Sequence, residues 1–116
     1  MANILHIATI DSWKTGKASG FYAIDTLKSE GFIHCSTPKQ VVRVARERFA
    51  GRDDLVLLEI AENRVRVEIK YENCEGGTEL FPHLYGPLNV DAVVCEHEFA
   101  PDENGEFKLP VGLDGG

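Results

Sequence analysis

One short segment constrains the fold of this chain more than any other: Phe81-Pro82-His83-Leu84-Tyr85-Gly86-Pro87-Leu88. Each proline fixes its own φ angle and biases the preceding residue toward extended backbone, while Gly86 permits a bend. Because this composition suits neither a helix nor an ordinary strand, the sequence predicts a stiffened turn that presents His83 and Tyr85. The alternative is a connection whose apolar residues fill the core and whose histidine is merely exposed.

The length of the chain allows one domain. With 116 residues, 43% of them hydrophobic, the segment 1–116 can bury one core but is too short for two domains. Its apolar runs are shorter than a membrane span, and its first three residues lack the basic start of a signal peptide. We therefore expect a cytoplasmic protein without membrane contact, and the oligomeric state stays open.

Charge and cysteine content restrict the partners. The chain has 12 Lys and Arg against 19 Asp and Glu, and the net charge of -7 repels polyanions and argues against broad nucleic-acid binding. A small phosphorylated ligand is compatible with this charge, because one local arginine can outweigh it. Cys35, Cys74 and Cys95 contain no CxxC pair, so we expect free thiols rather than disulfides or a structural zinc site.

The hydrophobic pattern predicts an α+β domain of mostly antiparallel sheets with one main helix. Strands are expected over residues 3–9, 31–36, 54–60, 65–71 and 91–99, helical or turn segments over 11–18 and 25–30, and a turn over 102–105 after which 107–109 pairs back. The segment 21–24 is ambiguous.

The main helix is expected over residues 38–50. Thr37 fits the N-cap, Pro38 the first helical position, and Gln40 the third residue of a capping box. Gly51 ends the helix. An apolar stripe is formed by Val41, Val42, Ala45 and Phe49, and it predicts that Phe49 is a core residue.

Histidines are the main candidates for chemistry. His6 and His34 on strands and His83 on a stiff loop could converge as acid, base and electrostatic clamp, or as neutral nitrogens around a metal. Spacing alone does not choose between these uses. No HxH or HExxH spacing fixes two ligands on one element, so we expect no metal. His97 lies on a common strand face with apolar residues, which favours a structural role.

Cysteine and the aromatic residues near the N-terminus can each be interpreted as core residues or as site residues. Cys35 could act as a nucleophile, but adjacent strand residues point to opposite faces, so it does not face His34 and is expected to be a small buried hydrophobe. Tyr22, like Trp13 and Phe21, could stack on a nicotinamide or base, or belong to the core.

Two motifs carry a family resemblance. The segments Gly31-Phe32-Ile33-His34-Cys35-Ser36-Thr37 and Phe81 to Leu88, together with His6 and the stretch 50–55, resemble a family of small bacterial proteins catalogued only as a domain of unknown function. More distantly, that family resembles the ADP-ribosyltransferase-like superfamily. The resemblance implies a split barrel of two packed sheets with NAD bound in the cleft between them.

The resemblance also assigns residues. Leu5-His6-Ile7 is similar to the first-strand motif of those enzymes, and His34-Cys35-Ser36 is similar to the His-x-Ser strand of the RNA 2'-phosphotransferase branch. A glutamate usually follows near a later strand, but the matching region here is 82–85, with Glu79 as the nearest acid. This departure argues against protein ADP-ribosylation unless His83 or Tyr85 substitutes.

Two functions follow from these residues. One is an enzyme, a transferase or hydrolase acting on NAD or an ADP-ribose-like compound. The other is a module on the same fold that binds a nucleotide or small metabolite without turning it over, which the missing glutamate favours. The residues expected to line the cleft divide into a catalytic set (His34, His83, Tyr85) and a ligand-binding set (His6, Ser36, Tyr22).

Overall fold

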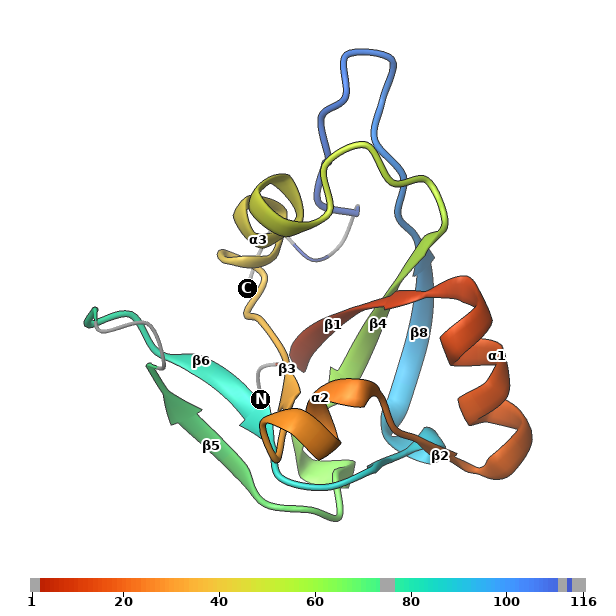
Figure 1. The fold of residues 1–116 in the computed structure, drawn as a ribbon, viewed down its shortest axis with the longest axis vertical. Helices are drawn as coiled ribbons and strands as arrows, with labels where there is room; N and C mark the ends of the chain where they lie inside the picture. The colour runs from red at the N-terminus through yellow and green to blue at the C-terminus, as the bar shows by residue number, and fades with distance from the viewer. Residues whose placement is uncertain (1–2, 74–76, 111–112, 114–116) are drawn as a thin grey trace.

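The computed structural model describes residues 3–73, 77–110 and 113, and it describes residues 25 and 26 without their side chains (Figure 1). The helices are α1 (Ile10–Ser19), α2 (Asp25–Ser29) and α3 (Val41–Arg48). The strands are β1 (Asn3–Thr9), β2 (Phe21–Tyr22), β3 (Ile33–His34), β4 (Leu55–Ala61), β5 (Ile69–Glu72), β6 (Phe81–Leu84), β7 (Leu88–Asn89) and β8 (Val93–Glu98). Two short 3-10 helices cover Glu62–Arg64 and Val90–Ala92.

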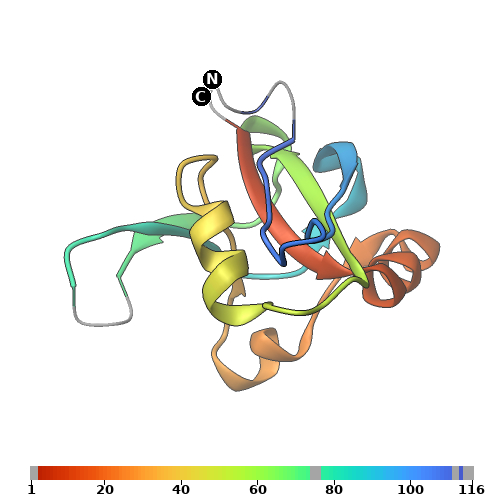
Figure 2. The same ribbon diagram turned by 90° about the horizontal axis from the view of Figure 1, so that it is seen from above.

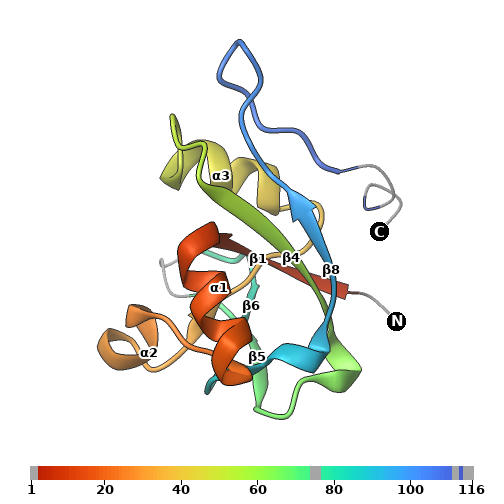
Figure 3. The same ribbon diagram turned by 90° about the vertical axis from the view of Figure 1, so that its right-hand side faces the viewer.

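The main sheet has the order β1-β4-β8 and is antiparallel (Figure 3). Because strand residues alternate between faces, even-numbered residues of β1 and β4 pack with Trp13 of α1, and odd-numbered ones pack with Val41 and Ala45 of α3. The two helices therefore cover opposite faces, and each face has its own hydrophobic cluster. The predicted strands over 3–9 and 54–60 are confirmed, the second shifted by one residue.

A second antiparallel sheet has the order β3-β6-β5, and its β5–β6 hairpin projects away from the main sheet (Figure 2). The prediction of a stiff turn over 81–88 was wrong for its first half, because Pro82 lies inside the central strand β6. Pro82 accepts a hydrogen bond from the Cys35 N–H at 2.9 Å but has no N–H to return. The ladder is therefore incomplete at this pair, and β3 ends at His34.

Among the described residues, one isolated backbone bridge links the two sheets. Leu5 of β1 and Ser36, two residues beyond β3, exchange both backbone hydrogen bonds at 2.7 Å and form an isolated antiparallel bridge. Downstream of β3 the chain thus leaves β6 and pairs with β1. The two sheets diverge from this bridge, and no closed barrel forms among the described strands.

The expectation of one main helix was wrong. The segment predicted as a short helix or turn is α1, which is the longer of the two larger helices. Thr9 caps its start, since the Thr9 hydroxyl accepts from the Ser12 N–H at 3.2 Å, and Gly20 ends it in the left-handed region at φ 89°. The short helix predicted within 25–30 is confirmed as α2.

Helix α3 is shorter than the predicted helix over 38–50. Residues 38–40 form a turn, and of the predicted capping box only the return bond forms, in which the Thr37 N–H donates to Gln40 Oε1 at 3.0 Å. Val41 and Ala45 are fully buried, whereas Phe49, beyond the helix end, is half-buried against the same cluster. Phe49 is therefore a boundary residue rather than a core residue.

Four strand predictions need correction. Of the segment 31–36 only Ile33–His34 is a strand, because Ser36 pairs with Leu5 of the other sheet. Of the segment 65–71 only residues 69–71 lie in a strand, which continues to Glu72, because the Arg66 N–H donates to the Asn89 side chain (3.0 Å) instead of to a neighbouring strand. The start of 91–99 belongs to a 3-10 helix. The turn over 102–105 is present, with Gly105 N–H donating to the Asp102 carbonyl (2.9 Å), but residues 107–109 do not form a strand.

The architecture is thus α+β, built of mostly antiparallel sheets and few helices. Within the described residues, none of the helices has both the length and the apolar character needed to cross a membrane.

Candidate functional site

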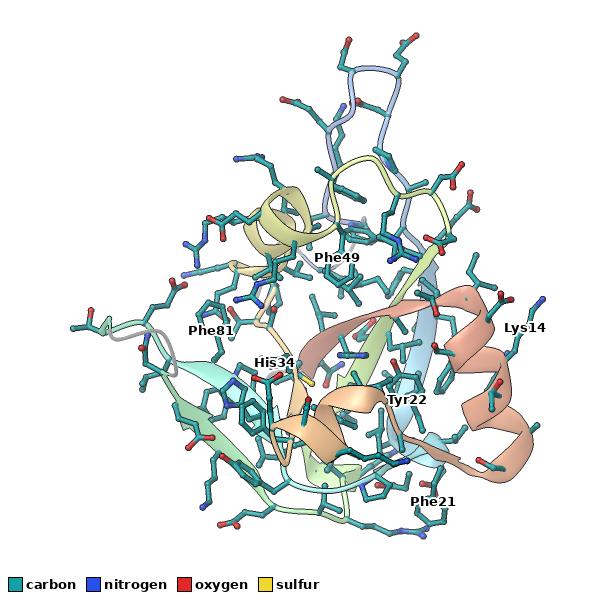
Figure 4. The ribbon with its side chains drawn as sticks, in the orientation of Figure 1. Lys14, Phe21, Tyr22, His34, Phe49 and Phe81 are labelled. Atoms are coloured by element: carbon teal, nitrogen blue, oxygen red, sulfur yellow. The ribbon has the colours of Figure 1, made fainter. Side chains whose placement is uncertain are left out.

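A pocket opens at the junction of the two sheets, beside the bridge between Leu5 and Ser36. Its volume is about 240 Å³, and it is lined from β1, the β3 region, α3, β6 and the α2 region by His6, Ile7, Ile24, Glu30, His34, Cys35, Ser36, Val44, Glu47, Arg48, Phe49, Phe81 and His83. Figure 4 shows Phe49 beside α3, and His34 and Phe81 on the neighbouring β3-β6-β5 sheet. A concave, largely apolar pocket with a few converging polar groups is the usual form of a small-molecule site.

Two histidines lie side by side on the sheet that faces this pocket. His34 of β3 and His83 of β6 are register partners, and their ring centroids are 5.2 Å apart with the planes nearly perpendicular. Phe32 stacks on the His83 ring at 4.1 Å between centroids. The aromatic contact and the strand pairing hold both rings in place, so the pair is preorganised.

The tautomer of the neutral His83 ring is set by its neighbour Glu72. Its Nδ1 lies 3.0 Å from Glu72 Oε1, and since an ionised carboxylate only accepts, Nδ1 carries the hydrogen. In the neutral ring this leaves Nε2 as an acceptor with a free lone pair. The side chain is 1% exposed, and no described group is within hydrogen-bond reach of Nε2. A buried nitrogen without a partner is costly, and a bound ligand would satisfy it.

Glu72 is held by two donors. The Tyr85 hydroxyl donates to the same Oε1 that accepts from His83. These hydrogen bonds, from Tyr85 first and His83 second, hold the pKa of Glu72 below its usual value. Lys70 lies over the Tyr85 ring, 4.8 Å from its centroid. Tyr85 thus positions the carboxylate behind His83, and it is not among the residues that line the pocket.

His34 has its own carboxylate. Its Nε2 lies 3.1 Å from Glu30 Oε2, and its side chain is 32% exposed, so it is closer to solvent than His83. Glu30 lines the same pocket. The site therefore contains two adjacent histidines, each paired with a glutamate, and one of them is open to water.

His6 belongs to the wall of the pocket. Its Nδ1 lies 2.6 Å from the His34 carbonyl and must donate to it, so Nε2 accepts from the Tyr22 hydroxyl at 2.9 Å. Burial lowers the pKa of His6 to about 4, so the ring is neutral at pH 7. Burial likewise raises the pKa of Tyr22, which is 1% exposed and does not line the pocket. Both ring nitrogens of His6 are already in use.

Ser36 and Cys35 complete the wall on the β3 side. Ser36 is 5% exposed and lines the pocket. Cys35 is buried with the core, and burial strongly raises the pKa of its thiol, so it stays protonated at neutral pH. This agrees with the expectation of a buried hydrophobe rather than a nucleophile.

The structure thus places His6, His34, Ser36 and His83 around one pocket, with Tyr85 and Tyr22 one hydrogen bond behind His83 and His6. Glu79, the acid nearest to the second motif in sequence, is instead bound by Arg43 and Gln40 and is not part of the lining.

Sequence reasoning missed Glu72 and Glu30. Glu72 faces Phe81 across the β5–β6 hairpin, on the same side as His83. That register could have been found only by pairing 69–72 with 81–84, which the predicted turn excluded. Glu30 lies four residues before His34, on the far side of the Gly31 bend, and no strand or helix periodicity connects the two.

Comparisons with known proteins agree with this fold. The crystal structure of protein CC0527 from Caulobacter crescentus, a structural-genomics target, is 33% identical to this chain, with a TM-score of 0.85 over 97% of this chain and 98% of that one. The solution NMR structure of CC0527 is 34% identical, with a TM-score of 0.81 over 94% of each chain. No match was found among curated proteins. The family model for "Protein of unknown function (DUF952)" matches residues 7–95, and the chain therefore belongs to the DUF952 family.

Proposed function

We propose that the pocket binds the base and ribose end of NAD or an ADP-ribose-like compound, and that the protein is a transferase or hydrolase acting on it. The observation that carries the proposal is the buried Nε2 of His83, which lines the pocket without a partner while Glu72 fixes it as an acceptor. A general base needs this arrangement: a free lone pair, a fixed tautomer and exclusion of water.

The pocket fits part of such a ligand. Its volume of about 240 Å³ is below the roughly 300–1,000 Å³ of pockets that enclose whole drug-sized molecules, so the remainder of a dinucleotide would lie outside. Phe49, Phe81 and Ile24 offer apolar surface to a flat ring, and Ser36 offers a hydroxyl. Arg48, also in the lining, offers positive charge to a phosphate.

In this proposal each predicted residue has a stated role. His83 Nε2 accepts a proton from the attacking water or hydroxyl, Glu72 and Tyr85 keep its ring oriented, and His34, with Glu30, donates a proton or hydrogen bond at the solvent side. Bound here, an NAD-like compound would supply the labile bond between its base and its ribose. His6 and Tyr22 support the wall of the pocket. Both His6 nitrogens are engaged within the protein, so they do not bind the ligand.

The proposal includes the type of fold and the cellular location of the protein. Two sheets that diverge from the Leu5–Ser36 bridge with a pocket between them support an ADP-ribosyltransferase-like split barrel. A small cytoplasmic protein of net charge -7 would take a small-molecule nucleotide or metabolite rather than a nucleic acid.

One observation favours a second function, a binding module without turnover. Glu79, the acid nearest to the motif, lies outside the pocket, and the lining carboxylate Glu30 is engaged by His34. Among the described lining residues, Glu47 is then the remaining carboxylate that could activate a ribose hydroxyl, and it belongs to α3 rather than to the second motif.

The test is a binding and turnover assay. The protein is screened by thermal shift with NAD, ADP-ribose and mononucleotides, and nicotinamide release from NAD and phosphate transfer from 2'-phosphorylated RNA are then followed. A ligand at about 100 times its Kd should add roughly 2.7 kcal/mol of stability.

The variants decide between the two functions. If the protein is an enzyme, His83→Gln should slow turnover on the order of 100-fold or more with a smaller change in affinity. Glu79→Gln, outside the pocket, is the matched control and should leave both unchanged. Binding without turnover in the parent supports the binding module, and no binding of any nucleotide contradicts both functions.

A further inference from the structure

A second group of chemically active side chains lies on the main sheet, away from the pocket. Glu59 of β4 and Cys95 of β8 are register partners, and His97 follows Cys95 by two residues, so all three share one sheet face. One ligand atom from each lies within 4.8 Å of the others, and none of the three residues lines the pocket. Glu59 and His97 side chains are each 17% exposed, whereas Cys95 is exposed.

The backbone brings Cys95 to this position. The register of β8 on β4 shifts between Glu59 and Ile60, where Ile60 pairs with Val93 and Glu59 with Cys95, leaving Val94 as the extra residue. Such a bulge changes which face the following side chains occupy, and bulges are frequent next to functional sites. The three donors lie in the regular register next to this bulge, in which Glu59 pairs with Cys95 and Leu57 with His97.

The donor set matches one class of metal. A thiolate, an imidazole and a carboxylate together suit Zn²⁺ and its borderline-soft relatives, since hard cations such as Mg²⁺ and Ca²⁺ prefer oxygen alone. Bond lengths of about 2.0–2.3 Å in a tetrahedral site separate donors by roughly 3.3–3.8 Å. Glu59 Oε1 and His97 Nε2 are 2.9 Å apart, and the whole set lies within 4.8 Å, so small side-chain movements reach that geometry.

A supporting contact is already in place. Asn3 Nδ2 donates to Glu59 Oε2 at 2.6 Å, so Oε1, which is hydrogen-bonded to His97, is the oxygen that faces the other two donors. Metal-binding carboxylates are commonly oriented by such a hydrogen bond on the other oxygen. Without metal, the Glu59–His97 hydrogen bond closes the site. On metal binding, the neutral His97 ring would carry its hydrogen on Nδ1, which frees Nε2 to bind the metal, and the Cys95 thiol would release its proton to solvent.

We propose that Glu59, Cys95 and His97 form a zinc site with three protein ligands and a fourth position open to water or another ligand. This site is independent of the proposed function of the pocket. The simpler interpretation is a His97–Glu59 hydrogen bond beside an unrelated thiol, and the two interpretations predict different behaviour of Cys95.

The experiment is a titration of the metal-free protein with Zn²⁺ by calorimetry and with Co²⁺ by absorption spectroscopy. We expect one ion per chain and, with Co²⁺, the near-ultraviolet charge-transfer band of a thiolate-to-cobalt bond. Cys95→Ser should abolish the band and weaken Zn²⁺ binding by at least tenfold, and Asn3→Ala should weaken it on the order of 10- to 100-fold.

Cys74→Ser is the matched control and should retain both the band and the affinity. Melting of each metal-free variant is measured first, and His97→Gln provides a second ligand variant in case Cys95→Ser fails to fold. Absence of stoichiometric binding, or a cobalt band that persists in Cys95→Ser, would overturn the proposal.

Discussion

At the scale of single residues, the buried His6 links the pocket wall to the acid stability of the protein. The ring is held neutral between the His34 carbonyl and the Tyr22 hydroxyl, and burial lowers its pKa from 6.5 to about 4. In the unfolded chain the same ring takes up a proton near pH 6.5. The unfolded state therefore binds more protons than the folded state between these two values.

The first prediction follows from that difference. The contribution of His6 to the free energy of unfolding is complete above pH 6.5 and is lost as the pH falls toward 4, amounting to about 3 kcal/mol. NMR titration of the ring in the folded protein should give a midpoint near pH 4, with the urea-unfolded protein as control near 6.5. A folded-state midpoint close to that of the unfolded chain would contradict the assignment.

Asn89 provides the second prediction. This residue is 2% exposed, its Oδ1 accepts from the Arg66 N–H at 3.0 Å, and its Nδ2 donates to the Arg64 carbonyl and to Asp91. Because Asn89→Ala removes three hydrogen bonds of a buried side chain, two of them to the partly buried Arg64 carbonyl and Arg66 N–H, it should lower the free energy of unfolding by about 1 to 3 kcal/mol.

Urea denaturation measures that change. Asn104→Ala, in the exposed turn, is the matched control and should stay within about 0.5 kcal/mol of the parent. Equal midpoints for the two variants would show that the Asn89 network contributes no stability.

At the scale of elements, α1 contains a glycine where alanine would normally be better. A Cβ built on Gly16 would lie 3.0 Å from the Cα, Cβ and Cδ1 of Tyr22. Helix propensity favours alanine over glycine by about 1 kcal/mol, but here the helix packs too closely on β2 to admit the methyl group.

The third prediction is therefore that Gly16→Ala destabilises the protein instead of stabilising it. The substitution should also displace Tyr22 from His6, which would appear as a change in the His6 ring resonances. Lys14→Ala, exposed on the same helix, is the control for helix propensity and should be close to neutral. A higher melting temperature for Gly16→Ala would show that β2 yields easily.

Elements also show how far the sequence could predict the fold. Continuous or alternating apolar residues predicted β1 and β4, and an apolar stripe predicted α3. An element that is buried on one or two faces has apolar residues at regular positions in the sequence. The strand β6 was missed because Pro82 breaks strand propensity, and only the tertiary pairing with Cys35 shows that its carbonyl still joins the ladder.

The candidate site was predicted only in part, because local motifs are visible in the sequence and strand pairing is not. His34 and His83 were chosen from local motifs, and they do meet across β3 and β6. The positions of two glutamates depend on strand register: Glu72 fixes the His83 tautomer, and Glu59 faces Cys95. The hydrophobic pattern of the sequence does not show which polar residues face each other.

At the scale of the whole molecule, the described backbone of the two sheets meets in one isolated bridge. Leu5 and Ser36 exchange two hydrogen bonds, and this isolated bridge lies beside the pocket. A molecule seated between β1 and β6 would contact both sheets at once. If the pocket binds a ligand as proposed, binding and the relative orientation of the sheets should be coupled at this bridge.

The amide protons of Leu5 and Ser36 in this bridge can therefore be used to measure whether the pocket is occupied. In the free protein the Leu5 and Ser36 amides should exchange with deuterium through a local opening that parts the sheets, earlier than the amides in the middle of β4. A ligand that binds the pocket should slow exchange at these two positions by roughly the factor 1 + [L]/Kd. Exchange that stays constant at saturating ligand would mean that the sheets move independently of the pocket; slower exchange at both positions would make these two protons a real-time signal of the proposed ligand's binding.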